Sequence, residues 1–212
     1  MSELDFSAMR AAMVSNQLRT NKVTDARVVA AMKAVARENF VPAERSALAY
    51  VDVPIPLGHG RGLNSPLVTA RLIAESGIES GEKILLVGAA TGYAAALLNE
   101  LGANVTALEV DESLAAVGKA AGIRYVMGPL EAGWRKGAPY DVILIDGAVE
   151  AIPAAIEAQL ANGGRLLTGL VDKGVTRLAL GRKSGQSVGL VSFADLEAVA
   201  LPGFTPPKSF SF

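Results

Sequence analysis

The spacing of apolar residues changes near residue 80, and this change divides the chain into two predicted parts. From Lys83 onward, short apolar runs alternate with segments whose apolar residues recur at helical spacing. Strands are expected at residues 83–87, 104–109, 123–127, 140–146 and 164–170, helices at 92–101, 111–121 and 150–160, and a weak helix at 129–135. Because such alternation builds a mostly parallel sheet with helices on both faces, we expect an α/β fold.

The end of the chain has a different pattern. After Lys173 the apolar spacing shortens, which predicts antiparallel edge strands at 175–180 and 187–193. Residues 201–212 contain three prolines and a glycine, and we expect an irregular tail there.

The first 78 residues predict a helical cap on the sheet. Apolar residues at helical spacing indicate a helix over 5–19, and Thr24-Asp25 can cap a second helix that ends before Pro42. Residues 42–66 are rich in proline and glycine, and such a long ordered loop suggests function. Pro66 suits the first turn of a helix that reaches about Ser76. We expect one compact unit, with a cap and substrate loop over 1–78 and the sheet domain over 79–212.

Composition narrows the class of protein. Of the 212 residues, 50% are hydrophobic, and 20 basic against 21 acidic residues give a net charge of -1, which does not favour binding to nucleic acid or an anionic membrane. The chain has no cysteine, which excludes disulfides, thiolate metal sites and a cysteine nucleophile. Its acidic start does not resemble a signal peptide, and no apolar run reaches the ~18 residues of a membrane span. We therefore expect a cytoplasmic protein.

The clearest chemical signal is a glycine turn after the first sheet strand. Gly88, Ala89, Ala90, Thr91 and Gly92 follow the apolar run, and the next strand ends at Glu109. Glycines let backbone approach a ligand, and an acid at the second strand tip can accept hydrogen bonds from both ribose hydroxyls. The turn lacks the GxGxxG pattern of dinucleotide sites and the Gly-Lys-Ser/Thr of a P-loop, so S-adenosylmethionine fits better than a nicotinamide. A plain structural turn, with Glu109 as a helix cap, remains the alternative.

Two further polar residues are weaker candidates. Asp146 is predicted at the tip of the fourth strand, where it either meets a ligand or makes an ordinary turn before Gly147. His59 is the only histidine, so it cannot form a metal cluster by itself, and no metal site is expected. It could act as a general base, but a loop histidine bonded to backbone is the simpler interpretation.

With these motifs in their order, the chain resembles the protein-L-isoaspartate O-methyltransferase family over nearly its whole length. The resemblance rests on residues 13–18, 35–42 with Val41-Pro42, 49–60 with Gly58-His59-Gly60, 133–134, 138–141, and 159–166 with Gly163-Gly164. It implies a Rossmann-like class I S-adenosylmethionine-dependent methyltransferase fold. It also implies methyl transfer from S-adenosylmethionine, leaving S-adenosylhomocysteine, to the isoaspartyl carboxylate of damaged peptides or proteins.

Site residues carry over from the resemblance position by position. The family's functional serine falls on Asn64, with Ser65 beside it, and these are the catalytic candidates. The cofactor would contact Gly88, Ala89, Ala90, Thr91, Gly92, Glu109, Gly128, Pro129, Leu130 and Asp146. The substrate would contact Leu57, Gly58, His59 and Arg61, where Arg61 either pairs with a substrate carboxylate or is simply solvated. Asn64 is expected to point into a cleft that residues 54–66 close from one side.

Four of the departures from the family pattern remove a polar ligand contact or crowd the pocket. Leu86 replaces an acid, Ala90 replaces the middle glycine of the turn, Pro129 replaces an aspartate that meets the adenine, and Asn64 lacks the serine hydroxyl. Losing two or three contacts of about 1 kcal/mol each predicts cofactor binding weakened by roughly ten- to hundredfold. The alternatives are therefore a catalytically impaired member acting as a binding module, or a methyltransferase for another carboxylate. The reaction needs no strong base, because the attacking carboxylate is already ionised, so alignment and exclusion of water would supply the catalysis.

Overall fold

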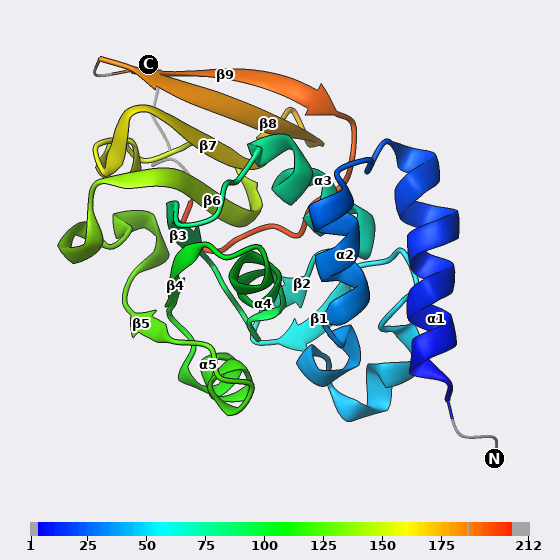
Figure 1. Cartoon of the computed structure of the whole chain (residues 1–212). Coiled ribbons are helices and arrows are strands. Elements are labelled where there is room, and N and C mark those ends of the chain that lie inside the picture. Colours follow the sequence, from blue (N-terminus) through cyan, green and yellow to red (C-terminus); the bar gives the residue numbers. More distant parts are fainter. Residues whose placement is uncertain (1–3, 186, 205–212) are drawn as a thin grey trace.

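A seven-stranded sheet in the order β5-β4-β3-β6-β7-β8-β9 organises the chain in a computed structural model that describes residues 4–185 and 187–204 (Figure 1). The strands are β3 (Lys83–Val87), β4 (Asn104–Glu109), β5 (Tyr125–Met127), β6 (Tyr140–Val149), β7 (Leu160–Asp172), β8 (Val175–Ser184) and β9 (Ser187–Ala194). Strands β3 to β7 pair in parallel, whereas β8 and β9 add antiparallel pairs at one edge. The predicted parallel sheet and its antiparallel edge are confirmed.

The strand order reverses at β3. This strand pairs with β4 on one side and with β6 on the other, so the connections after β3 and after β6 leave the sheet in different directions. In open α/β sheets, ligands bind at the carboxyl ends of the strands beside such a switch point. The glycine turn after β3 therefore lies where the fold itself favours a site.

Side-chain alternation along β3 builds two cores. Ile84 and Leu86 face the larger core, which also contains side chains of α2 (Ala26–Ala34), α3 (Pro66–Ser76) and α4 (Tyr93–Glu100). Leu85 and Val87 face a smaller core on the opposite side of the sheet, together with Leu130, Ile156 and Phe204. Leu86, which stands where the family has an acid, is fully buried apolar packing.

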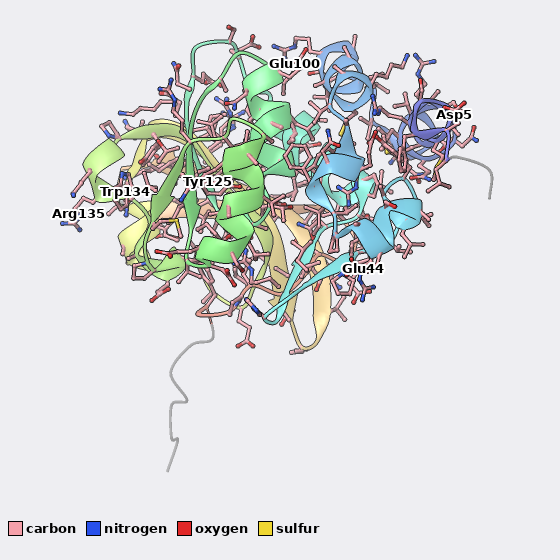
Figure 2. The ribbon with its side chains drawn as sticks, turned by 90° about the horizontal axis from the view of Figure 1, so that it is seen from below. Asp5, Glu44, Glu100, Tyr125, Trp134 and Arg135 are labelled. Atoms are coloured by element: carbon pink, nitrogen blue, oxygen red, sulfur yellow. The ribbon has the colours of Figure 1, made fainter. Side chains whose placement is uncertain are left out.

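The N-terminal helices form as predicted, with one irregular stretch. Helix α1 (Phe6–Met13) continues through a wider π-helical stretch, Val14–Leu18, and Asp5 caps its start by accepting from the Ala8 amide at 2.9 Å. Asp25 caps α2 in the same way, at 2.8 Å from the Arg27 amide. Figure 2 shows Asp5 on the opposite side of the molecule from Trp134 and Arg135, which belong to the connection between β5 and β6.

The proline- and glycine-rich stretch is more regular than predicted. A 3₁₀ helix at Ala43–Leu48 is followed by a hairpin of β1 (Ile55–Gly58) and β2 (Arg61–Leu63), which pair only with each other in the described part of the chain. Prolines at strand edges and glycines at the turn suit a short two-stranded hairpin, so part of the predicted ordered loop is a pair of strands. The hairpin leads directly into α3, with Ser65 as its cap.

Two predicted helices are shorter than expected. The segment 150–160 holds only α6 (Ala154–Glu157), and residues 129–135 form a 3₁₀ turn at Leu130–Ala132 and the start of another at Arg135–Gly137. Helix α5 (Glu112–Ala120) matches its prediction closely. The boundary between cap and sheet domain near residue 78 stays a prediction.

The segment after β9 returns to the centre of the sheet, drawn in red in Figure 1. Val199 accepts from the Ala148 amide at 2.7 Å, and the Leu201 amide donates to Ala148 at 2.9 Å. Leu201 and Phe204 are buried, so the predicted irregular tail begins with residues that pack into the core. The remainder of the predicted tail, 205–212, lies outside the described residues.

Candidate functional site

The glycine turn uses left-handed backbone at three of its five positions. Gly88, Ala90 and Gly92 have φ angles of 76°, 48° and 96°, and Gly92 begins α4. Ala90 takes this conformation at a cost that a glycine would not incur, because its Cβ crowds the backbone. Thr91 donates its hydroxyl to the Phe40 carbonyl at 2.7 Å, which ties the turn to the N-terminal cap.

Glu109 is the centre of the site and is fully buried. Its Oε2 accepts from the Ala90 amide at 2.7 Å, and its Oε1 accepts from the amides of Val110 and Asp111 at 2.8 and 3.0 Å. Backbone donors therefore fix the carboxylate in one orientation at the tip of β4. Glu109 thus lies beside the glycine turn, and its contact with a ribose stays a prediction.

A guanidinium occupies the open side of this carboxylate. Arg61 Nη1 donates to Glu109 Oε1 at 2.5 Å, and Arg61 Nη2 donates to the Gly88 carbonyl at 3.3 Å. The Arg61 residue is 5% exposed, and its Nε has no hydrogen-bond partner among the described residues. The interpretation of Arg61 as a solvated side chain was wrong, because the residue is buried, whereas its pairing with a substrate carboxylate stays a prediction.

Leu201 covers the other side of the turn. A Cβ atom placed on Gly88 would lie 3.0 Å from Leu201 Cδ2 and 3.4 Å from Arg61 Nη2. One placed on Gly147 would lie 2.5 Å from Leu201 Cγ. The leucine thus fits between two glycines at the switch point, and only residues without side chains leave room for it.

Asn64 and Asp146 form a second buried polar group next to this one. Asn64 Nδ2 donates to Asp146 at 2.8 Å, and Asn64 Oδ1 accepts from the Val199 amide at 2.8 Å. Burial raises the pKa of Asp146, although the hydrogen bond from Asn64 and the charges of Arg37 and Arg61 act in the opposite direction. Asp146 lies within β6 rather than at its tip, since the strand continues past a register irregularity to Val149.

The remaining predicted residues are spread around this centre. Ser65 accepts from the Val68 amide at 3.4 Å as the cap of α3, so its hydroxyl has a structural partner. His59, at the exposed tip of the hairpin, lies 2.5 Å from Asp111, and hydrogen bonds from Ser113 and His59 hold the pKa of that carboxyl well below its usual range. Leu57 and Gly58 lie on the same hairpin.

A cavity of about 490 Å³ opens beside the ends of β4 and β5. It is lined by Val110, Met127, Gly128, Pro129, Leu130, Glu131, Pro202 and Gly203. Three of the predicted cofactor residues, Gly128, Pro129 and Leu130, thus share a cavity with the segment that carries Leu201. Leu130 is itself buried.

Three residues that shape the site were not among those predicted from the sequence. Leu201 and Val199 come from the segment after β9, and Tyr125 donates its hydroxyl to the Ala90 carbonyl at 3.0 Å. Burial, with a contribution from Glu109, raises the pKa of Tyr125 far above its usual value. The only sequence signal for the final segment was an apolar pair, Leu201 and Phe204, flanking Pro202-Gly203.

Neither a cluster of metal ligands nor a helix able to cross a membrane occurs in the described part of the chain. No group of three or more histidine, cysteine, aspartate and glutamate side chains is arranged to hold a metal ion there. Within the same residues, none of the helices has the length and apolar character needed to cross a bilayer.

The sheet, its switch point and the acid beside the glycine turn define a class I S-adenosylmethionine-dependent methyltransferase fold. Solved structures support this class. One described as a protein-L-isoaspartate O-methyltransferase aligns with a TM-score of 0.78 at 22% identity, covering 92% of this chain and 66% of that one. A Plasmodium falciparum structure of the same description, in complex with S-adenosyl-L-homocysteine, aligns with a TM-score of 0.76 at 18% identity, covering 94% of this chain and 99% of that one.

The chain belongs to the protein-L-isoaspartate(D-aspartate) O-methyltransferase family, whose model matches residues 9–201. A relative from Methylorubrum populi, named protein-L-isoaspartate O-methyltransferase, is 39% identical and covers 89% of this chain and 95% of its own length. A relative of the same name from Koribacter versatilis is 35% identical and covers 96% of each chain. The resemblance seen in the sequence is confirmed.

The side chains at the centre of the site do not fit an adenosyl cofactor as they stand. A ribose diol that bonds to both oxygens of the Glu109 carboxylate would meet the Arg61 guanidinium at Oε1. The backbone face of Gly88, which a cofactor would approach, is covered by Leu201 and Arg61. Glu109 keeps the family position of the acid, but side chains of the protein, Arg61 and Leu201, fill the space beside it.

Proposed function

We propose that this chain is a protein-L-isoaspartate O-methyltransferase, which transfers a methyl group from S-adenosylmethionine to isoaspartyl carboxylates in damaged proteins. The observation that carries the proposal is the family match over residues 9–201, together with named relatives at 35–39% identity over most of the chain. The buried Glu109 beside the left-handed turn supports it, because backbone donors hold this carboxylate where the fold places a nucleoside.

The roles of individual residues are part of this proposal. The hairpin with Leu57, Gly58 and His59 would form one wall of a peptide groove, because it crosses the carboxyl ends of the strands and its tip is exposed. Asn64 would orient the substrate from the position of the family's serine, with Ser65 shaping the start of α3 beneath it. Isoaspartyl peptides or proteins are the proposed partners.

The test is methyl transfer from labelled S-adenosylmethionine to an isoaspartyl peptide, with the aspartyl peptide of the same sequence as control. We expect label in the isoaspartyl peptide alone, at a low rate, because Asn64 and Pro129 depart from the family pattern. Asn64→Ser combined with Pro129→Asp should raise the rate. Equal labelling of the two peptides, or none in either at saturating cofactor, would contradict the proposal.

A second candidate function is favoured by one contact. This candidate is an isoaspartyl-peptide binding module that does not use the cofactor. It is favoured because Arg61 pairs with Glu109 inside the cofactor site. Peptide binding without any methyl transfer, measured on the same two peptides, would favour this candidate over the first.

A further inference from the structure

We propose that Arg61 and Leu201 form an internal plug in the cofactor site, so that an adenosyl ligand binds only after both side chains have moved away. This inference rests on the proposed function, because it concerns the same site. It adds a device that neither the fold nor the family match implies, namely competition between the cofactor and the protein's own side chains.

The first part of the plug is Arg61, which bonds to Glu109 where a ribose hydroxyl would bond. Two backbone amides and Arg61 Nη1 converge on Oε1 of the carboxylate, whereas Oε2 accepts the Ala90 amide alone. A ribose diol that bonds to both oxygens would therefore meet the guanidinium at Oε1. A ribose hydroxyl is a neutral donor of similar reach, so it cannot share this position with a guanidinium. Binding of a nucleoside therefore requires the ion pair to break.

The second part is apolar and covers the turn from the opposite side. Leu201 lies against both Gly88 and Gly147, at the point where the sheet order reverses. It belongs to the smaller core together with Val87 and Ile145, so it is held by packing rather than by a polar contact of its own side chain.

The two parts are mechanically linked. Asn64, three residues after Arg61, accepts from the Val199 amide, two residues before Leu201. A displacement of the hairpin that withdraws Arg61 therefore pulls on the segment that carries Leu201. We infer that the plug opens as one unit.

The plug is held incompletely, which makes it displaceable. Arg61 Nε has no partner among the described residues although it is buried, and the contact from Nη2 to Gly88 is long at 3.3 Å. A buried donor without a partner disfavours the closed arrangement. The hairpin itself pairs with no other strand in the described part, and its tip is joined to the sheet domain by the exposed contact between His59 and Asp111.

The experiment measures S-adenosylhomocysteine binding by calorimetry to the full chain and to Arg61→Gln and Leu201→Ala. We expect Arg61→Gln to bind at least about tenfold more tightly than the unchanged protein, and Leu201→Ala to bind more tightly by a smaller factor. The matched control is Arg177→Gln, which removes an arginine from an exposed ion pair with Asp195 and should leave the affinity unchanged. Circular dichroism and thermal unfolding establish that each variant is folded.

The outcomes separate this inference from the proposed function. Arg61→Gln binding no tighter than the unchanged protein overturns the plug, whether or not the chain methylates isoaspartyl peptide. If Arg61→Gln gains affinity while the unchanged chain transfers no methyl group to the isoaspartyl peptide, the plug is supported and the methyltransferase proposal is contradicted. A gain of similar size in Arg177→Gln would also overturn the plug, because the effect would then be unrelated to the site.

Discussion

Two arginines, Arg37 and Arg61, are almost fully buried, but they lie in different regions and have different partners. The guanidinium of Arg37, at the junction of cap and sheet, donates to two carbonyls among the described residues, those of Ala49 at 2.8 Å and Asn64 at 2.6 Å. It also stacks 4.7 Å from the centre of the Tyr93 ring. Arg61, at the ends of the sheet strands, faces the carboxylate of Glu109.

This difference in partners indicates that Arg37 stabilises the fold, whereas Arg61 occupies the position proposed for a ligand. Burial lowers the pKa of Arg37, while the Tyr93 ring and Asp146 act against this shift, and the carbonyls it serves have no other described side-chain donor. Arg61 serves an acid that the backbone already holds in position. Loss of Arg37 should therefore damage the fold, and loss of Arg61 should open the site.

The largest loss of stability is expected when Glu109, the partner of Arg61, is changed. Glu109→Gln leaves the Arg61 guanidinium buried without a counter-charge and should lower the free energy of unfolding by about 3–5 kcal/mol. Urea unfolding measures this, and the double variant Arg61→Gln with Glu109→Gln should recover most of the loss. A loss in the double variant equal to the sum of both single variants would show that the pair is not coupled.

A smaller loss of stability is expected when Arg37 is changed. Arg37→Met keeps the apolar stem but removes the donors to Ala49 and Asn64, and should cost about 2–3 kcal/mol in urea unfolding. Its affinity for S-adenosylhomocysteine should not rise, in contrast to Arg61→Gln. Arg177→Met, from an exposed pair, serves as control at below about 1 kcal/mol. An affinity gain in Arg37→Met would remove the distinction between the two arginines.

Asn64 lies between the two arginines, and its substitution should lower stability by less than either of the two changes above. Asn64→Ala removes the bonds to Asp146 and to the Val199 amide, and should cost about 1–2 kcal/mol. Asn99→Ala, at an exposed position of α4, is the control and should change stability by less than about 0.5 kcal/mol. Equal effects of the two substitutions would mean that the buried amide does not hold the final segment.

The smallest expected effect is a pH dependence. Because burial raises the pKa of Asp146 in the folded protein, the folded state binds more protons than the unfolded state between the ordinary and the raised pKa. Stability contributed by this group is therefore present below the ordinary pKa and is lost as the pH rises through the raised one. Asp146→Asn keeps the bond to Asn64 and should reduce this loss in urea unfolding across the acidic range. An unchanged pH profile, matching that of Asp195→Asn at the surface, would contradict the assignment.

Much of the fold and half of the site could be predicted because the signals are local. Apolar spacing placed β3, β4 and α4 to within a few residues, and the turn from Gly88 to Gly92 with its acid at Glu109 followed from the ends of those elements. The hairpin was missed because paired prolines and glycines in a short stretch have the composition of a loop. Asp146 was placed at a strand tip because the sequence carries no sign of the register irregularity in β6.

By itself, the sequence determined the class of fold and the position of Glu109, since hydrophobic periodicity and turn residues act over a few neighbours, and its motifs in their order determined the family. Only the tertiary structure decided what stands in front of that acid. Arg61 meets Glu109 across 48 positions of the chain, and Asn64 meets Val199 across 135. Such contacts depend on how the hairpin and the final segment pack across the sheet, and no local pattern of residues encodes that packing.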